Sequence, residues 1–175
     1  MSWRGEEIPA GLAWYDVMRQ RMRAEIEAFP ESIQTVAVSS EHLHSRLRSV
    51  EDVQNVADLF DGLFETINIV VYLRRQDRLA VSLYSTALRV GWTYGNVLPK
   101  TGAVRQHYYD FQQLLERWSG VFGEDHMTVR LFERSQFLNG SLYADFLQAC
   151  GWPELVGQLQ DQGNRISHRP RFVLG

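Results

Sequence analysis

The stretch that decides the fold runs from Ile67 to Leu88 and reads INIVVYLRRQDRLAVSLYSTAL. Its first part, Ile67–Leu73, is dominated by apolar and β-branched residues, a composition typical of a strand buried on both faces in a parallel sheet. After Arg74 and Arg75 the apolar residues recur in pairs at helical spacing, at 79–80, 83–84 and 87–88. The stretch therefore predicts a strand, a tight turn and a helix.

Two arginines stand at the predicted carboxyl end of this buried strand, where open parallel sheets bind their ligands. Asp77 is the predicted N-cap of the following helix, whose free amides favour an anion. Ser82 follows Arg74 by eight positions, within a polar helix stripe formed by Arg78, Ser82, Ser85 and Arg89. Because the planar guanidinium of arginine matches phosphate oxygens, the pattern indicates an anion site. A solvated strand end followed by a polar helix face is the alternative.

The rest of the chain alternates short β-branched runs with amphipathic helices, which predicts an α/β fold with a parallel β-sheet and flanking helices. Further strands are predicted at Thr35–Ser39 and Met127–Phe132. A helix that begins at Ser49, with Asp52 completing a capping box, is predicted to join Thr35–Ser39 to the central strand in a βαβ unit. The remaining predicted helices are Leu12–Phe29, Val104–Trp118 and Leu142–Cys150.

A second group of titratable side chains follows the predicted strand Thr35–Ser39. It contains Glu41, His42 and His44, and the parallel-sheet prediction places it on the same edge as Arg74. A carboxylate or an imidazole there could act as a general base toward a hydroxyl nucleophile. The alternative is structural: Ser40 caps a helix and Glu41 favours its first turn.

Composition limits the classes of function. The chain has 175 residues, 45% hydrophobic and 22% charged, as expected for one globular domain. Its net charge of −3 argues against a surface that binds nucleic acid or an anionic membrane. Cys150 is the sole cysteine, which excludes an internal disulfide and a cysteine-rich metal site. The sequence has no apolar run long enough for a membrane span, so the expected location is cytoplasmic. The oligomeric state stays open.

The central stretch resembles the segment by which sulfotransferases bind the 3′-phosphate of 3′-phosphoadenosine-5′-phosphosulfate (PAPS). The piece YLRRQDRLAVSLY is most similar to bacterial sulfotransferase-like and carbohydrate sulfotransferase sequences. The resemblance implies a P-loop-NTPase-like sulfotransferase fold, with Arg74 and Ser82 as the two 3′-phosphate ligands. It also implies PAPS as co-substrate, no metal, and a hydroxyl acceptor on a carbohydrate or a small molecule. In weaker form it extends from about Val36 to Asn164.

Other segments carry the same resemblance. The piece SSEHL looks like the region that holds the acceptor-activating base in sulfotransferases, which makes Glu41 the first candidate and His42 and His44 the next. The run MTVRLFERSQFLNGSLYADFL resembles a strand ending in an acidic residue before a helix that carries Asp-Phe-Leu, here at residues 145–147. The piece at 164–167 is similar to a late Asn-containing element of the family.

The sequence departs from the family in one segment. No Gly-rich loop with a Lys and a Ser or Thr follows a strand before Glu41, although sulfuryl transfer needs such donors on the 5′-phosphate. Residues 1–175 are therefore interpreted as a single sulfotransferase-like domain without its first strand and 5′-phosphosulfate loop, and the activity of this chain alone is left open. A non-catalytic interaction module with the sulfotransferase fold is the alternative. A P-loop kinase or NTPase is disfavoured by the absence of G-x-x-x-x-G-K-[ST].

Overall fold

A small parallel sheet forms the centre of the molecule. The computed structural model describes residues 2–3, 6–7, 12–92, 96–98 and 106–160. In it, β3 (Ile69–Leu73) pairs in parallel with β4 (Met127–Leu131) over their full lengths. The ladder continues one step further, because the Phe132 N–H donates to the Leu73 carbonyl over 2.8 Å. The predicted α/β architecture with flanking helices, and the placing of Met127–Phe132 in one parallel sheet with the central strand, are confirmed.

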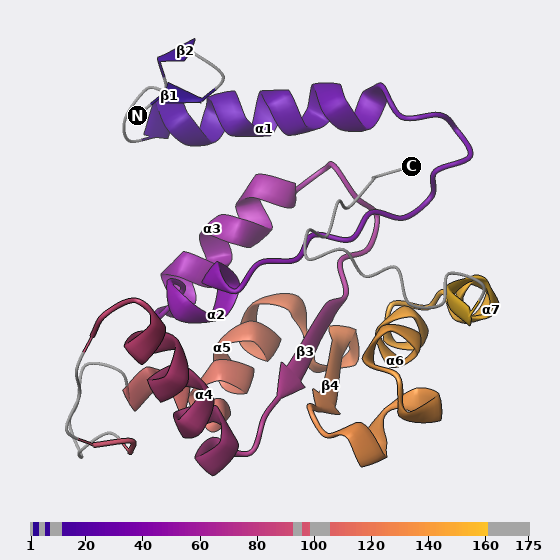
Figure 1. The fold of residues 1–175 in the computed structure, drawn as a ribbon. Coiled ribbons are helices and arrows are strands. Elements are labelled where there is room, and N and C mark those ends of the chain that lie inside the picture. Colours follow the sequence, from indigo (N-terminus) through magenta and orange to yellow (C-terminus); the bar gives the residue numbers. More distant parts are fainter. Residues whose placement is uncertain (1, 4–5, 8–11, 93–95, 99–105, 161–175) are drawn as a thin grey trace.

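Helices flank the two strands on both sides. They are α1 (Leu12–Glu27), α2 (His42–Ser45), α3 (Val50–Phe60), α4 (Gln76–Arg89), α5 (Phe111–Phe122), α6 (Leu142–Ala149) and α7 (Val156–Gln160). Short 3₁₀ turns are η1 (Gln106–Tyr108), η2 (Glu124–His126), η3 (Arg134–Gln136), η4 (Leu138–Gly140) and η5 (Pro153–Leu155). A two-residue antiparallel pair, β1 (Ser2–Trp3) with β2 (Glu6–Glu7), precedes α1. Figure 1 shows α3, α4 and α5 to one side of the strands and α6 and α7 to the other.

The core lies between β3 and the helices α3 and α5. Val53 from α3 and Leu114 and Trp118 from α5 are buried together, and alternate residues of β3 (Ile69, Val71 and Leu73) pack against them. Burying one such aliphatic side chain stabilises a fold by about 1.5–3 kcal/mol, so this cluster fixes the two helices to one face of the strand. Tyr72 lies between Val71 and Leu73 and therefore faces α6 on the opposite side.

Local side-chain bonds fix the starts of three helices. The predicted capping box at Ser49 is confirmed: its hydroxyl accepts from the Asp52 N–H at 3.0 Å, and the Asp52 carboxylate accepts from the Ser49 N–H at 2.9 Å. Asp110 caps α5 by accepting from the Gln113 N–H at 3.1 Å, and Ser141 caps α6. Gly151 ends α6 with a φ of 80°, a left-handed conformation that glycine adopts without strain.

One predicted strand is wrong. Thr35–Ser39 is irregular, and Val38 is 58% exposed. A β-branched run becomes a strand only when another strand accepts its backbone hydrogen bonds, and no described strand pairs with this segment. The predicted βαβ unit that starts there is therefore also wrong. In the structure, α4 and α5 lie between the two parallel strands in the chain.

Several predicted boundaries also move. The central strand begins at Ile69 rather than Ile67. Helix α4 begins one residue before Asp77, whose carboxylate accepts from the Arg75 side chain instead of capping the helix.

The carboxyl-terminal helices differ from prediction as well. The helix predicted from residue 104 begins at Phe111, because the Asp110 cap starts a new helix after η1, and it continues to Phe122. Helix α6 ends one residue before Cys150, and α7 was not predicted. Residues 164–167 lie outside the described part of the chain. Among the helices of the described part, none has the length and apolar character needed to span a membrane.

Candidate functional site

Arg74 lies at the edge of the sheet where β3 and β4 both end. We call this edge, with Arg74 after β3, Phe132 after β4 and the first turn of α4, the carboxyl rim. The side chain of Arg74 is half-buried, and its Cζ lies 5.2 Å from the centroid of the Phe132 ring. Among the described residues, none accepts a hydrogen bond from the Arg74 guanidinium. Its donors are therefore available to a ligand, as the predicted anion site requires.

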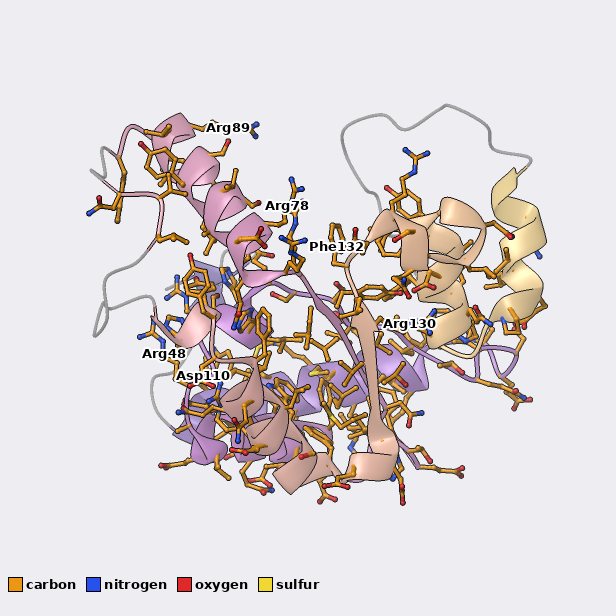
Figure 2. All side chains as sticks on the ribbon, turned by 90° about the horizontal axis from the view of Figure 1, so that it is seen from below. Arg48, Arg78, Arg89, Asp110, Arg130 and Phe132 are labelled. Atoms are coloured by element: carbon orange, nitrogen blue, oxygen red, sulfur yellow. The ribbon has the colours of Figure 1, made fainter. Side chains whose placement is uncertain are left out.

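Ser82 lies on α4, half-buried, about two turns from the start of the helix. At about 1.5 Å per residue, its Cα is roughly 9 Å along the axis from that of Gln76. An anion that contacts both Arg74 and Ser82 therefore lies beside the first turns of α4 rather than on the axis. Figure 2 shows Arg78 and Arg89 leaving α4 on one side, as the predicted polar stripe requires. Arg78 is exposed one helical turn before Ser82 and could add positive charge there.

The neighbouring Arg75 is engaged differently. Its Nε and Nη2 donate to the two carboxylate oxygens of Asp77 at 3.0 and 2.7 Å. This exposed bidentate bond raises the pKa of Arg75 and lowers the pKa of Asp77. Of the two arginines at the predicted strand end, Arg74 is the one whose donors are not taken by a described carboxylate.

The candidate bases lie on and beside the short helix α2. Glu41 is exposed at the N-cap position without a capping bond, while the Ser40 hydroxyl accepts from the His42 N–H at 3.2 Å. His42 is also exposed, and its Nδ1 is 3.4 Å from the Ser45 hydroxyl. Ser40 thus satisfies a helix-start amide, as the structural alternative predicts, and Glu41 and His42 remain open to solvent.

His44 is packed rather than open. Its ring meets the Tyr108 ring edge-on at 5.3 Å, which places α2 beside η1. Burial, followed by the nearby charge of His107, lowers the pKa of His44 below its usual 6.5, so the ring is neutral at pH 7. The His44 Nε2 is enclosed, with no hydrogen-bond partner among the described residues. An enclosed nitrogen cannot reach an acceptor hydroxyl, so this geometry favours Glu41 and His42 over His44 as a base.

The structure does not join the two groups of predicted site residues. No hydrogen bond, ion pair or ring contact links the α2 group to Arg74 or Ser82 within the described residues. A shallow, open groove of about 320 Å³ lies between the starts of α4 and α5, where Gln76 donates to the Tyr109 carbonyl at 2.8 Å. Its lining residues are Gln76, Tyr109, Asp110, Phe111 and Gln112. In the described ranges no cluster of His, Cys, Asp and Glu could hold a metal ion.

A buried charge network lies behind the carboxyl rim. Asp145 of α6 is 1% exposed and accepts from both Arg130 Nε, at 3.1 Å, and Arg130 Nη2. It also accepts from the Tyr72 hydroxyl at 2.7 Å and from the Leu138 N–H at 3.1 Å. These donors, Arg130 first, hold the pKa of Asp145 at about 2, while burial and then the Asp145 hydrogen bond raise the pKa of Tyr72. The network ties β3, β4 and α6 together.

Neither Phe132 nor this network is among the predicted site residues. The position of Phe132 in the sequence could have indicated it, because Phe132 directly follows one parallel strand as Arg74 directly follows the other. The signal for Asp145 was a lone carboxylate in the apolar helix LYADFLQA. Its partners Tyr72 and Arg130 could not be assigned without the register of the two strands.

Comparison with known proteins assigns no family. No family model matches the chain, and no solved structure matches it. A protein of Archaeoglobus fulgidus, named only as uncharacterized, is 35% identical over 108 residues. The match covers 61% of this chain and 29% of that protein, so the chain spans less than a third of its relative.

Proposed function

We propose that this chain belongs to a PAPS-dependent sulfotransferase-like domain whose carboxyl rim binds the 3′-phosphate of the nucleotide. Such a domain transfers a sulfuryl group from PAPS to a hydroxyl of a carbohydrate or a small molecule. The observation that carries the proposal is the position of Arg74 directly after a parallel strand, with α4 beginning two residues later and with no described residue accepting from its guanidinium. The local strand–turn–helix order supports a P-loop-NTPase-like fold for the domain.

The proposed ligands suit a phosphate chemically. The Arg74 guanidinium supplies two parallel N–H donors and a fixed charge, and the Ser82 hydroxyl supplies a single donor from the flank of α4. Positive charge on Arg78 and the amides of the first helical turn add attraction for a dianion. Contacts to the 5′-phosphate are not supplied by this rim. Binding by the rim alone should therefore be weak.

The transfer step also needs a base for the acceptor hydroxyl. Glu41 remains the first candidate because its carboxylate is exposed, with His42 beside it. In a preparation that transfers sulfuryl groups, Glu41→Gln should lower turnover on the order of 10²-fold and leave nucleotide binding nearly unchanged. Because His44 is enclosed, His44→Ala should instead lower stability together with activity. A larger specific loss of turnover at His42 or His44 would move the assignment to that residue.

Binding of adenosine 3′,5′-bisphosphate, measured by titration calorimetry or ligand-observed NMR, tests the phosphate site. AMP, which lacks the 3′-phosphate, is the matched ligand control. Arg74→Ala should weaken bisphosphate binding about tenfold or more, because one charge-assisted hydrogen bond contributes roughly 1.5–3 kcal/mol. Ser82→Ala should weaken it less, and Arg74→Lys should restore it only in part, since a point charge lacks the bidentate fork.

Arg89→Ala is the matched arginine control. The substitution removes a charge from the same helix stripe as Arg78. Arg89 itself lies in the last turn of α4, about 16 Å along the axis from Arg78. Equal binding of AMP and the bisphosphate, or equal losses from Arg74→Ala and Arg89→Ala, would rule out the phosphate site. Bisphosphate binding without any sulfuryl transfer would favour the non-catalytic module with the same fold.

A further inference from the structure

The guanidinium of Arg74 lies over the aromatic ring at the end of the neighbouring strand. Its Cζ is 5.2 Å from the centroid of the Phe132 ring. A cation above an aromatic face is attracted by the negative potential of the ring. The ring is not a hydrogen-bond acceptor of the kind that an arginine fork matches, and no described residue accepts from the Arg74 guanidinium. Contact with Phe132 and hydrogen bonding to an anion are therefore compatible.

Phe132 is itself held in place. Its backbone N–H is bonded to the Leu73 carbonyl at 2.8 Å, which ties it to the residue just before Arg74. Its ring meets the Tyr72 ring edge-on at 6.5 Å and the Phe137 ring edge-on at 5.5 Å. The Tyr72 ring is fixed in turn by the bond from its hydroxyl to the buried Asp145. A continuous chain of contacts thus runs from Asp145 through Tyr72 and Phe132 to Arg74.

We propose that Phe132 is the positioning residue of Arg74, whose guanidinium it holds at the carboxyl rim, where no described residue takes its N–H donors and an anion can accept from them. Arginine has several rotatable bonds, and a side chain already restrained loses less conformational entropy when it binds. Without this ring, the Arg74 side chain would lose its conformational entropy only when the anion binds, and that loss would lower the affinity. The identity of the anion rests on the proposed function, whereas the positioning of Arg74 does not.

The positioning can be tested without any ligand, by NMR of the wild-type protein. Protons above the face of an aromatic ring are shifted upfield by the ring current. The Arg74 Nε–H resonance, assigned by its loss in Arg74→Lys, should therefore lie upfield of exposed arginines such as Arg89. The upfield shift should disappear in Phe132→Leu, which keeps apolar bulk without a ring, and should persist in Phe132→Trp. Phe137→Leu is the matched control: it removes a ring that supports Phe132 but leaves the ring over which Arg74 lies, so it should reduce the upfield shift less than Phe132→Leu does.

Ligand binding gives the functional readout. Phe132→Leu should weaken binding of adenosine 3′,5′-bisphosphate by about twofold to fivefold, the size of an exposed cation–π contact. Phe132→Trp should bind like the wild type, and Phe137→Leu should lose less affinity than Phe132→Leu, once each variant is shown to be folded by circular dichroism.

Two results would overturn the positioning role. One is an Arg74 resonance in the wild-type protein with no upfield shift, which needs no variant to fold. The other is an equal effect of Phe132→Leu and Phe137→Leu on that resonance. If no variant, including the wild type, binds the bisphosphate, the proposed function fails while the NMR result still decides whether Phe132 positions Arg74.

Discussion

Arg130 lies in β4 and Arg74 directly follows the neighbouring strand β3, but their chemical settings differ. Arg130 donates from both Nε and Nη2 to Asp145, a carboxylate that is 1% exposed. The Cζ of Arg74 lies over the Phe132 ring, and no described residue accepts a hydrogen bond from its guanidinium. The difference teaches that the presence of a carboxylate partner, not the presence of an arginine, separates a structural ion pair from a candidate ligand site.

The largest expected effect is at the acceptor of the structural pair. Asp145→Asn leaves the Arg130 charge without its partner and should lower the free energy of unfolding by about 3–5 kcal/mol, as when one half of a buried ion pair is removed. Urea unfolding followed by circular dichroism measures this. Asp125→Asn, at an exposed acid in η2, is the matched control and should leave stability nearly unchanged. A small effect at Asp145 would mean that the network does not hold β3, β4 and α6 together.

Acid should remove the same contribution in the wild-type protein. The folded pKa of Asp145 is about 2, below its ordinary value of 3.8, so its stabilisation is present above pH 4 and lost as the pH falls towards 2. A shift of this size corresponds to about 2 kcal/mol. Urea midpoints measured between pH 5 and pH 2 should fall less steeply in Asp145→Asn than in the wild type. Parallel pH profiles of the two proteins would contradict the assigned cause.

A smaller effect is expected from the hydroxyl of the same network. Tyr72→Phe removes the 2.7 Å hydrogen bond to Asp145 but keeps the ring that contacts Phe132. It should lower the free energy of unfolding by about 1.5 kcal/mol, typical of a hydrogen bond to a charged group. The ring-current shift of Arg74 should persist, because the aromatic contacts remain. Loss of that shift would show that the hydroxyl, and not ring packing, holds Phe132 in place.

A separate pH effect is expected from His44. Because burial lowers its folded pKa below 6.5, the folded protein loses stability relative to the unfolded chain as the pH falls below 6.5. His44→Gln, which has no imidazole to protonate, should flatten the stability profile between pH 6.5 and 5. The wild-type profile, measured in parallel, is the reference. An unchanged slope in His44→Gln would mean that His44 is not the group that titrates in this window.

The smallest effect concerns the second rim arginine. Arg75 is exposed and its donors are taken by Asp77, so Arg75→Ala should weaken bisphosphate binding only slightly. Titration calorimetry beside Arg74→Ala measures the contrast. A loss at Arg75 as large as that at Arg74 would show that the rim attracts anions by its summed charge and not through one free guanidinium.

The sequence by itself determined the elements whose causes are local. The change of period around Arg74 predicted β3 and α4, and the Ser49–Asp52 pair predicted the start of α3, because capping depends on residues within one turn. It also predicted a parallel sheet that contains both β3 and β4, although it paired β3 with Thr35–Ser39. Whether Arg74 and Ser82 bind a nucleotide, and whether Glu41 acts as a base, stay predictions.

Only the tertiary structure decided what depends on distant partners. Thr35–Ser39 has the composition of a strand, but no described strand pairs with it. A β-strand forms only where a neighbouring strand accepts its backbone hydrogen bonds. Asp77 was predicted to be the N-cap of α4, but in the structure its carboxylate accepts from the Arg75 side chain instead. Asp145 meets Tyr72 across 73 positions of sequence, a contact that exists only once β3 and β4 are in register. Hydrogen-bond partners far apart in the chain are set by packing, which no local pattern encodes.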